Sequence, residues 1–96
     1  MTVTRQMVAE DMVMAFPRHV TFRHDAVRGR WVILAPERLL LPDDTAVEIL
    51  QRLDGKRSIA QIIDLLATEF NAPRDAIAAD VVAMLQDLLD KGMVQP

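Results

Sequence analysis

The sequence predicts an α+β domain in which a three-stranded antiparallel sheet is followed by three helices. Two observations carry this prediction. Three short apolar segments with the pattern of β-strands lie between residues 19 and 41, and apolar residues recur at helical spacing after residue 43. Turn residues separate these segments from one another. The 96 residues make one domain, and an apolar content of 51% is enough for a small core.

The first two strands are predicted to form a hairpin. In residues 19–24, Val20 and Phe22 point to one face and their polar neighbours to the other. A turn that ends at Gly29 leads to the second strand, residues 30–34. This strand is apolar on both faces, so both faces need to be covered. The helices can cover only one, and the other requires the N-terminal segment, a partner or a second copy of the chain.

The third strand is predicted at residues 37–41, between Pro36 and Pro42. Proline lacks the backbone N–H that pairs strands, so a strand bounded by two prolines and followed by helices is expected at a sheet edge. An edge strand offers backbone N–H and C=O groups that another chain can use. The sequence therefore favours the capture of a peptide as the function to consider first.

The first two helices have recognisable start signals. The first begins at Asp43 or Thr45, since either side chain can cap it, and ends near Leu53. The second begins at Ser58, with Gln61 placed three residues later as the partner of a capping box.

The third helix is predicted over residues 73–91, with a proline in its first turn and Gly92 at its end. Together with the second helix it resembles a helix-turn-helix, and with the sheet the whole domain is winged-helix-like. Each helix carries an apolar face for the core. In chain order these faces comprise Ala46, Val47, Leu50 and Leu53; Ile59, Ile62, Ile63, Leu66 and Phe70; and Ile77, Val81, Met84, Leu85 and Leu88.

Residues 1–16 are predicted to form an apolar tail in front of a domain that spans residues 17–96. Val8, Met12 and Phe16 recur at a spacing of four, which allows a short helix, but so short a helix is marginal by itself. We expect the tail to become ordered only by docking on the domain or on a partner. Charged residues interrupt it, so we expect neither a signal peptide nor a membrane span, and a cytoplasmic location fits.

The chain lacks the residue patterns of an enzyme or a metal site. It has no cysteine, and its two histidines, His19 and His24, are five residues apart on a predicted strand and so point to opposite faces. Asp43 and Asp44 are adjacent, but acids at the start of a helix are expected to cap it. We therefore expect no catalysis, no cofactor and no bound metal.

Charge is distributed unevenly along the chain. Between residues 17 and 38, five arginines face two acids, whereas from residue 39 onward ten acids face five bases. Two interpretations remain open: these are two ordinary solvated surfaces, or the sheet is a basic surface that attracts an acidic partner.

A winged-helix DNA-binding regulator is the main alternative function. Its third helix would read the bases. Here that helix carries four aspartates against two basic residues, and the whole chain has a net charge of −3, both of which disfavour contact with phosphates. We therefore expect no nucleic acid partner. The four aspartates are Asp75, Asp80, Asp87 and Asp90. An oligomerisation module without a peptide ligand is the third alternative.

Several short motifs in a specific order suggest a family. They are Gly29-Arg30-Trp31-Val32-Ile33-Leu34-Ala35-Pro36-Glu37-Arg38, Leu41-Pro42-Asp43, Leu53-Asp54-Gly55, Ala79-Asp80-Val81, and Leu88 through Lys91-Gly92-Met93. In this order they resemble the PqqD family, the peptide chaperones of pyrroloquinoline quinone biosynthesis. The resemblance covers residues 17–94 and leaves residues 1–16 unmatched. Met93 stands where Leu or another bulky apolar residue is expected.

The resemblance implies a peptide chaperone that is not an enzyme. Family members bind the precursor peptide of the quinone and present it to a radical S-adenosylmethionine enzyme, which links a glutamate to a tyrosine of the peptide. The peptide is expected to add as a strand beside the third strand and to lean on the third helix. The peptide-binding residues so implied are Arg38, Leu39, Leu40, Leu41, Val81, Met84, Leu85 and Leu88. A homodimer, formed through exchange of strands, is one way to cover the second face of the sheet.

Overall fold

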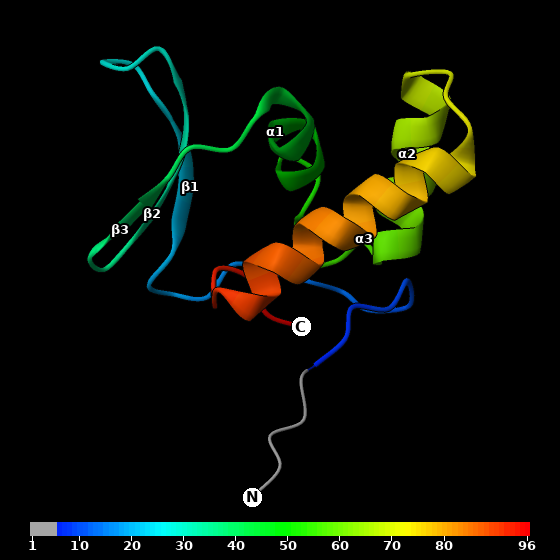
Figure 1. The fold of residues 1–96 in the computed structure, drawn as a ribbon, viewed down its shortest axis with the longest axis horizontal. Helices are drawn as coiled ribbons and strands as arrows, with labels where there is room; N and C mark the ends of the chain where they lie inside the picture. The colour runs from blue at the N-terminus through cyan, green and yellow to red at the C-terminus, as the bar shows by residue number, and fades with distance from the viewer. Residues whose placement is uncertain (1–5) are drawn as a thin grey trace, which may run out of the picture.

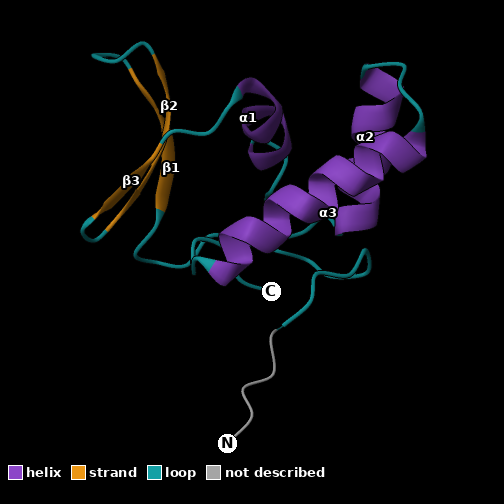
Figure 2. Cartoon of the chain, in the orientation of Figure 1, coloured by secondary structure: helices purple, strands orange, loops and turns teal. Residues whose placement is uncertain are grey.

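A computed structural model describes residues 6–96 and has the element order β1–β2–β3–α1–α2–α3 (Figure 1). All strands are antiparallel, and β2 lies between β1 and β3. The predicted α+β fold is confirmed, and β3 is an edge strand (Figure 2). The elements are β1 Thr21–Asp25, β2 Arg30–Ala35, β3 Arg38–Leu40, α1 Asp44–Leu50, α2 Ile59–Glu69 and α3 Arg74–Asp90.

A two-residue loop, Pro36-Glu37, joins β2 to β3. Pro36 has the fixed φ that suits the first central position of a turn, and Glu37 has a φ of 62°. The left-handed conformation costs a residue other than glycine about 1–2 kcal/mol. The sequence had predicted Glu37 as the first residue of the strand, but it lies in the loop. β3 is therefore shorter than predicted. The pairs across this hairpin are Ala35 with Arg38, Leu34 with Leu39, and Ile33 with Leu40.

β1 begins two residues later than predicted. His19 lies in a turn ahead of the strand, and only His24 belongs to it, so the expectation that both histidines lie on one strand is wrong. Throughout residues 6–96, the His, Asp and Glu side chains form no group of three that could hold a metal ion.

The two faces of the sheet have different surroundings, because all three helices lie on one side of it (Figure 1). Phe22, Ile33 and Leu40 share the helix-facing side and join the core. Phe22 also stacks on Phe16 and on Trp31, with ring centroids 5.6 and 4.8 Å apart. The outer face carries side chains of the opposite alternation, namely Thr21, Arg23, Val32, Leu34 and Leu39.

The helix starts follow the predicted caps. The Asp43 carboxylate accepts a hydrogen bond from the Ala46 N–H at 2.8 Å, so Asp43 and not Thr45 caps α1. Ser58 and Gln61 form the predicted capping box at the start of α2.

The helix ends depend on left-handed residues. At the end of α2, Asn71 has a φ of 48° and the Ala72 N–H donates to the Ala67 carbonyl at 3.0 Å. At the end of α3, Gly92 has a φ of 75° and the Met93 N–H reaches the Leu88 carbonyl at 2.8 Å. Both patterns are Schellman motifs, which satisfy the last carbonyls of a helix.

The core is built mainly from the helices, and most of the predicted apolar faces are buried in it. Two predictions are wrong. α1 ends at Leu50 instead of Leu53 and buries Ile49, whereas Val47 is only half-buried. Phe70 was assigned to the buried face of α2, but it is the C-cap residue and is 53% exposed.

Residues 6–16 lie along the helices and the C-terminal segment. Residues 1–5 of the predicted tail lie outside the described residues. The segment is extended and contains no helix, in contrast to the short helix that its spacing allowed. It forms isolated β-pairs between Val13 and Ser58 and between Ala15 and Gln95. The described part of the tail therefore packs against the helices and, through Phe16, against the helix-facing side of the sheet, and not against its outer face.

The tail also completes the N-terminus of α2. The first N–H groups of a helix have no partner within it. Here the Ile59 N–H donates to the Met12 carbonyl at 2.9 Å, and the Ala60 N–H donates to the Glu10 carbonyl at 2.8 Å. Two residues after Met12, the side chain of Met14 is fully buried in the core.

Two polar side chains hold the tail to α3. Gln86 is buried; its side-chain carbonyl accepts from the Val8 N–H at 2.9 Å, and its amide donates to the Gln6 carbonyl at 3.0 Å. Arg74 pairs with Glu10 at 2.7 Å and with Asp64 at 2.6 Å. These bonds raise the pKa of Arg74 above its usual range, and the hydrogen bond to Glu10 has the largest effect.

Candidate functional site: an edge strand beside an apolar groove

A groove of about 260 Å³ lies between β3 and the C-terminal half of α3. Its apolar lining comes from both elements, and its rim is completed by the segment that leads from β3 into α1. We call it the β3–α3 groove. It is lined by Ile33, Leu40, Leu41, Pro42, Asp43, Ala46, Met84, Asp87, Leu88 and Lys91.

Half of the predicted peptide-binding residues line this groove, namely Leu40, Leu41, Met84 and Leu88. Arg38 lies at its end, where its guanidinium donates to the Lys91 carbonyl at 3.4 Å. Leu39 is 40% exposed, and its side chain points to the outer face of the sheet, away from the groove. The remaining two, Val81 and Leu85, are fully buried and belong to the core.

The backbone of β3 has one residue whose polar groups point away from the sheet. A two-residue hairpin loop is closed by a hydrogen-bonded pair, here Ala35 with Arg38, and such pairs alternate with pairs that lack these bonds. Arg38 and Leu40 therefore bond to β2, whereas the N–H and C=O of Leu39 point outward along the edge. These outward groups are the ones that a strand added beside β3 would use.

Positive and negative charges lie at different ends of the groove. Arg30 donates to the Pro42 carbonyl at 3.3 Å, and Lys91 pairs with Asp87 at 2.9 Å. Arg38 has no carboxylate partner among residues 6–96, so its positive charge is available at the strand end of the groove. The carboxylates of Asp43, Asp44 and Asp80 lie on the side away from Arg38, around the start of α1 and the middle of α3.

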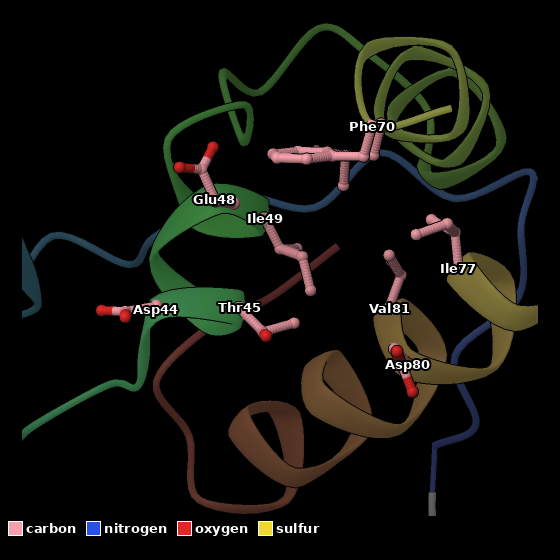
Figure 3. Close-up of a pocket in the computed structure, with 9 residues that line it drawn as sticks. Asp44, Thr45, Glu48, Ile49, Phe70, Ile77, Asp80 and Val81 are labelled. Carbon is pink, nitrogen blue, oxygen red and sulfur yellow. The ribbon is translucent and has the colours of Figure 1, made fainter. Parts of the chain in front are cut away.

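A second hollow, of about 370 Å³, lies where α1 faces the end of α2 and the first half of α3. Figure 3 shows the side chains of Ile49, Phe70, Ile77 and Val81 turned toward a common space, with carboxylates around its rim. We call it the Phe70 pocket. Its remaining lining residues are Asp44, Thr45, Glu48, Leu66 and Asp80.

The Phe70 pocket was not predicted from the sequence. Phe70 was expected in the core because it continues the apolar spacing of α2, and periodicity alone does not show where that helix ends. The signal that could have marked it is Asn71-Ala72-Pro73, which stops α2 directly after Phe70 and so leaves that ring at a helix end.

No helix within residues 6–96 has both the length and the apolar composition needed to cross a membrane.

The hydroxyl of Ser58, the single serine of the chain, accepts a hydrogen bond from the Gln61 N–H at 3.2 Å and so serves as a helix cap.

Comparison with known proteins identifies the family. The family described as Coenzyme PQQ synthesis protein D (PqqD) matches residues 30–94. A protein of Rhodopseudomonas palustris (strain BisB5), named PqqA binding protein, is 61% identical over 87 residues, which cover 91% of this chain and 85% of that protein.

Two solved structures share the fold. The solution NMR structure of the PqqD truncation of Methylobacterium extorquens PqqCD, described as a stand-alone RiPP recognition element, is 35% identical, with a TM-score of 0.80 over 96% of this chain and 97% of that chain. A lasso peptide synthetase B1 complexed with its leader peptide has a TM-score of 0.75 at 24% identity, over 88% of this chain and 100% of that chain. The resemblance inferred from the sequence motifs is thus confirmed, and the chain belongs to the PqqD family.

Proposed function

We propose that this chain is a peptide-binding recognition protein whose ligand is PqqA, the peptide after which its relatives are named. The observation that carries the proposal is the free edge of β3 beside the apolar β3–α3 groove. The names of the relatives and the recognition-element description of the Methylobacterium structure support the same ligand class. We take PqqA to be the precursor peptide of pyrroloquinoline quinone.

The proposed mechanism is strand addition. A peptide segment pairs with the outward N–H and C=O of Leu39, and these backbone bonds supply affinity that does not depend on the peptide's sequence. Because side chains alternate along a strand, every second peptide residue points into the groove, toward Leu40, Met84 and Leu88. The groove therefore sets the register of the peptide.

The length of β3 suits a chaperone. β3 has three residues and so spans about 10 Å, which is enough to bind only a short part of a peptide. The rest remains outside and accessible to another protein. We propose that a radical S-adenosylmethionine enzyme acts on this free part, and that the chain presents the peptide without catalysis of its own. A cytoplasmic location belongs to the same proposal.

The two alternatives make different demands on the structure. DNA binding would place the exposed aspartates of α3, such as Asp75, Asp80 and Asp87, against phosphate, which is repulsive. An oligomerisation module would pair β3 with β3 of a second copy. A homodimer of that kind would compete with PqqA, so light scattering during a peptide titration distinguishes the two uses of the edge.

Calorimetric titration of the protein with synthetic PqqA tests the proposal, and its salt dependence tests the role of Arg38. We expect an acidic part of the peptide at the strand end of the groove, so raising salt from about 0.05 to 0.5 M should weaken binding, mainly through the association rate. Arg38→Glu should lower the affinity by about fivefold or more, since an attractive charge becomes repulsive.

The matched control is Arg18→Glu, which changes the net charge equally at an exposed turn ahead of β1. If the two variants weaken binding equally, the effect belongs to the net charge and not to the groove. If neither variant nor salt changes the affinity, the apolar groove is the main source of binding energy. If wild-type protein does not bind PqqA at all, the proposed function is wrong.

A further inference from the structure

We infer that the bound peptide continues beyond β3 into the Phe70 pocket, which takes a large apolar side chain adjacent to a lysine or arginine of the peptide. The inference rests on the proposed function and adds a second subsite to it. Three observations carry it: the pocket is continuous with the β3–α3 groove, it contains an exposed aromatic ring, and its rim carries uncompensated carboxylates.

The two hollows are joined by a third, of about 430 Å³, which runs between α1 and α3. It shares Asp43, Ala46 and Met84 with the β3–α3 groove. It shares Thr45 and Asp80 with the Phe70 pocket. A continuous path therefore leads from the edge strand along α3 to the pocket.

The path is short enough for one peptide. Met84 and Ile77 mark its ends on α3, and seven residues of helix rise about 10 Å. An extended peptide covers this distance with about three residues. A segment that pairs with β3 and one that reaches the pocket can therefore be separated by only a few residues of the same peptide.

The lining of the pocket fits an apolar side chain. Ile49, Leu66 and Val81 form a buried floor, and half-buried Ile77 forms one wall. Phe70 stands over them and leaves 53% of its surface exposed, although it follows directly after α2. A ring so placed gains contact area when an apolar or aromatic group inserts beside it.

The rim of the pocket specifies the charge of the neighbouring peptide residue. Glu48 is paired with Arg52 at 2.9 Å, but the Asp44 and Asp80 carboxylates have no side-chain partner among residues 6–96. Their negative charge is complementary to a lysine or arginine. The strand end of the path has the opposite polarity, because Arg38 lies there. The path thus favours a peptide with an acidic residue at the strand end and a basic residue at the pocket, and it therefore favours one direction of binding.

The test combines two variants with a series of shortened peptides. Phe70→Ala and Asp80→Lys are titrated by calorimetry with full-length synthetic PqqA and with PqqA peptides shortened stepwise from each end. We expect Phe70→Ala to weaken binding of the full-length peptide about tenfold and Asp80→Lys about fivefold or more. Once shortening has removed the segment that enters the pocket, wild type and both variants should bind the remaining peptide equally.

The control is Val27→Ala, which removes an apolar side chain that is 96% exposed in the β1–β2 turn. It should bind every peptide as wild type does. If wild type binds PqqA but neither Phe70→Ala nor Asp80→Lys changes the affinity, the second subsite is refuted while strand addition stands. A loss that stays equal for every shortened peptide also refutes it, since the variants then act on the fold. If Phe70→Ala lowers the melting temperature, its weaker binding no longer tests the subsite. The exposed Asp80→Lys then decides whether the subsite exists, by the same comparison of full-length and shortened peptides.

Discussion

Leu39→Pro should fold and yet lose most of its affinity for PqqA, whereas Leu40→Pro should damage the fold. The Leu39 N–H points away from β2, so proline there breaks no bond of the sheet, and proline is tolerated on edge strands. The variant loses one bond to the added strand, and its ring obstructs the peptide, so we expect at least a tenfold weaker complex. At Leu40 the N–H bonds to β2, and proline removes that bond.

Both proline variants also remove a leucine side chain, so Leu39→Ala and Leu40→Ala are the controls. Circular dichroism and melting show which variants fold, and calorimetry gives their affinities. The decisive comparison is Leu39→Pro with Leu39→Ala, because the Leu39 side chain lies on the outer face and not in the groove. Equal affinities of these two variants would move the binding site away from β3, most directly to α3.

Met14→Ala should lower the free energy of unfolding by about 2–5 kcal/mol, because it leaves a cavity in the core. Met14 is fully buried among residues of the sheet and helices, although it belongs to the N-terminal tail. Met7→Ala is the matched control, since Met7 is 58% exposed and its truncation should cost no more than about 0.5 kcal/mol. Denaturant unfolding of the two variants measures the difference, and equal stabilities would show that the tail is not part of the core.

Deletion of residues 1–16 extends the same test. It removes the carbonyl partners of the Ile59 and Ala60 N–H groups and the pairing of Ala15 with Gln95. It also uncovers the site that Met14 fills. We expect a lower melting temperature and a change in solubility or oligomeric state as apolar surface becomes exposed. Unchanged melting and light scattering would exclude this role of the tail.

Local signals predicted much of the fold. The change of period after Pro42 separates the strands from the helices, and Asp43, Ser58 and Gly92 mark helix ends because capping depends on residues close in sequence. The prolines around β3 correctly indicated an edge strand.

The errors arise where distant contacts decide. The described tail, residues 6–16, is extended because it pairs with Ser58 and Gln95, and these partners are more than 40 residues away in sequence. Glu37 adopts a left-handed conformation that its residue type does not suggest, since the hairpin requires it. Neither fact can be read from periodicity.

The candidate site, too, was predicted only in part, because distant contacts decide which of its residues are accessible. The resemblance named one continuous stripe of α3, but the stripe has two roles, and spacing alone cannot separate them. Met84 and Leu88 face the β3–α3 groove, whereas Leu85 is enclosed by the core and Val81 lies in the buried floor of the Phe70 pocket. Their separation depends on where β3 and α1 pack against α3, which only the tertiary structure determines.

Backbone amide hydrogen exchange, followed by NMR with and without saturating PqqA, tests strand addition most directly. In the free protein the outward N–H of Leu39 should exchange rapidly, whereas that of Leu40, which bonds to β2, should be protected. Added PqqA should slow exchange at Leu39 sharply, because its N–H then bonds to the new strand, and should change exchange at Leu40 much less. Exchange at Leu39 that stays equally fast with the peptide fully bound would contradict the account, since no strand would then have been added to β3.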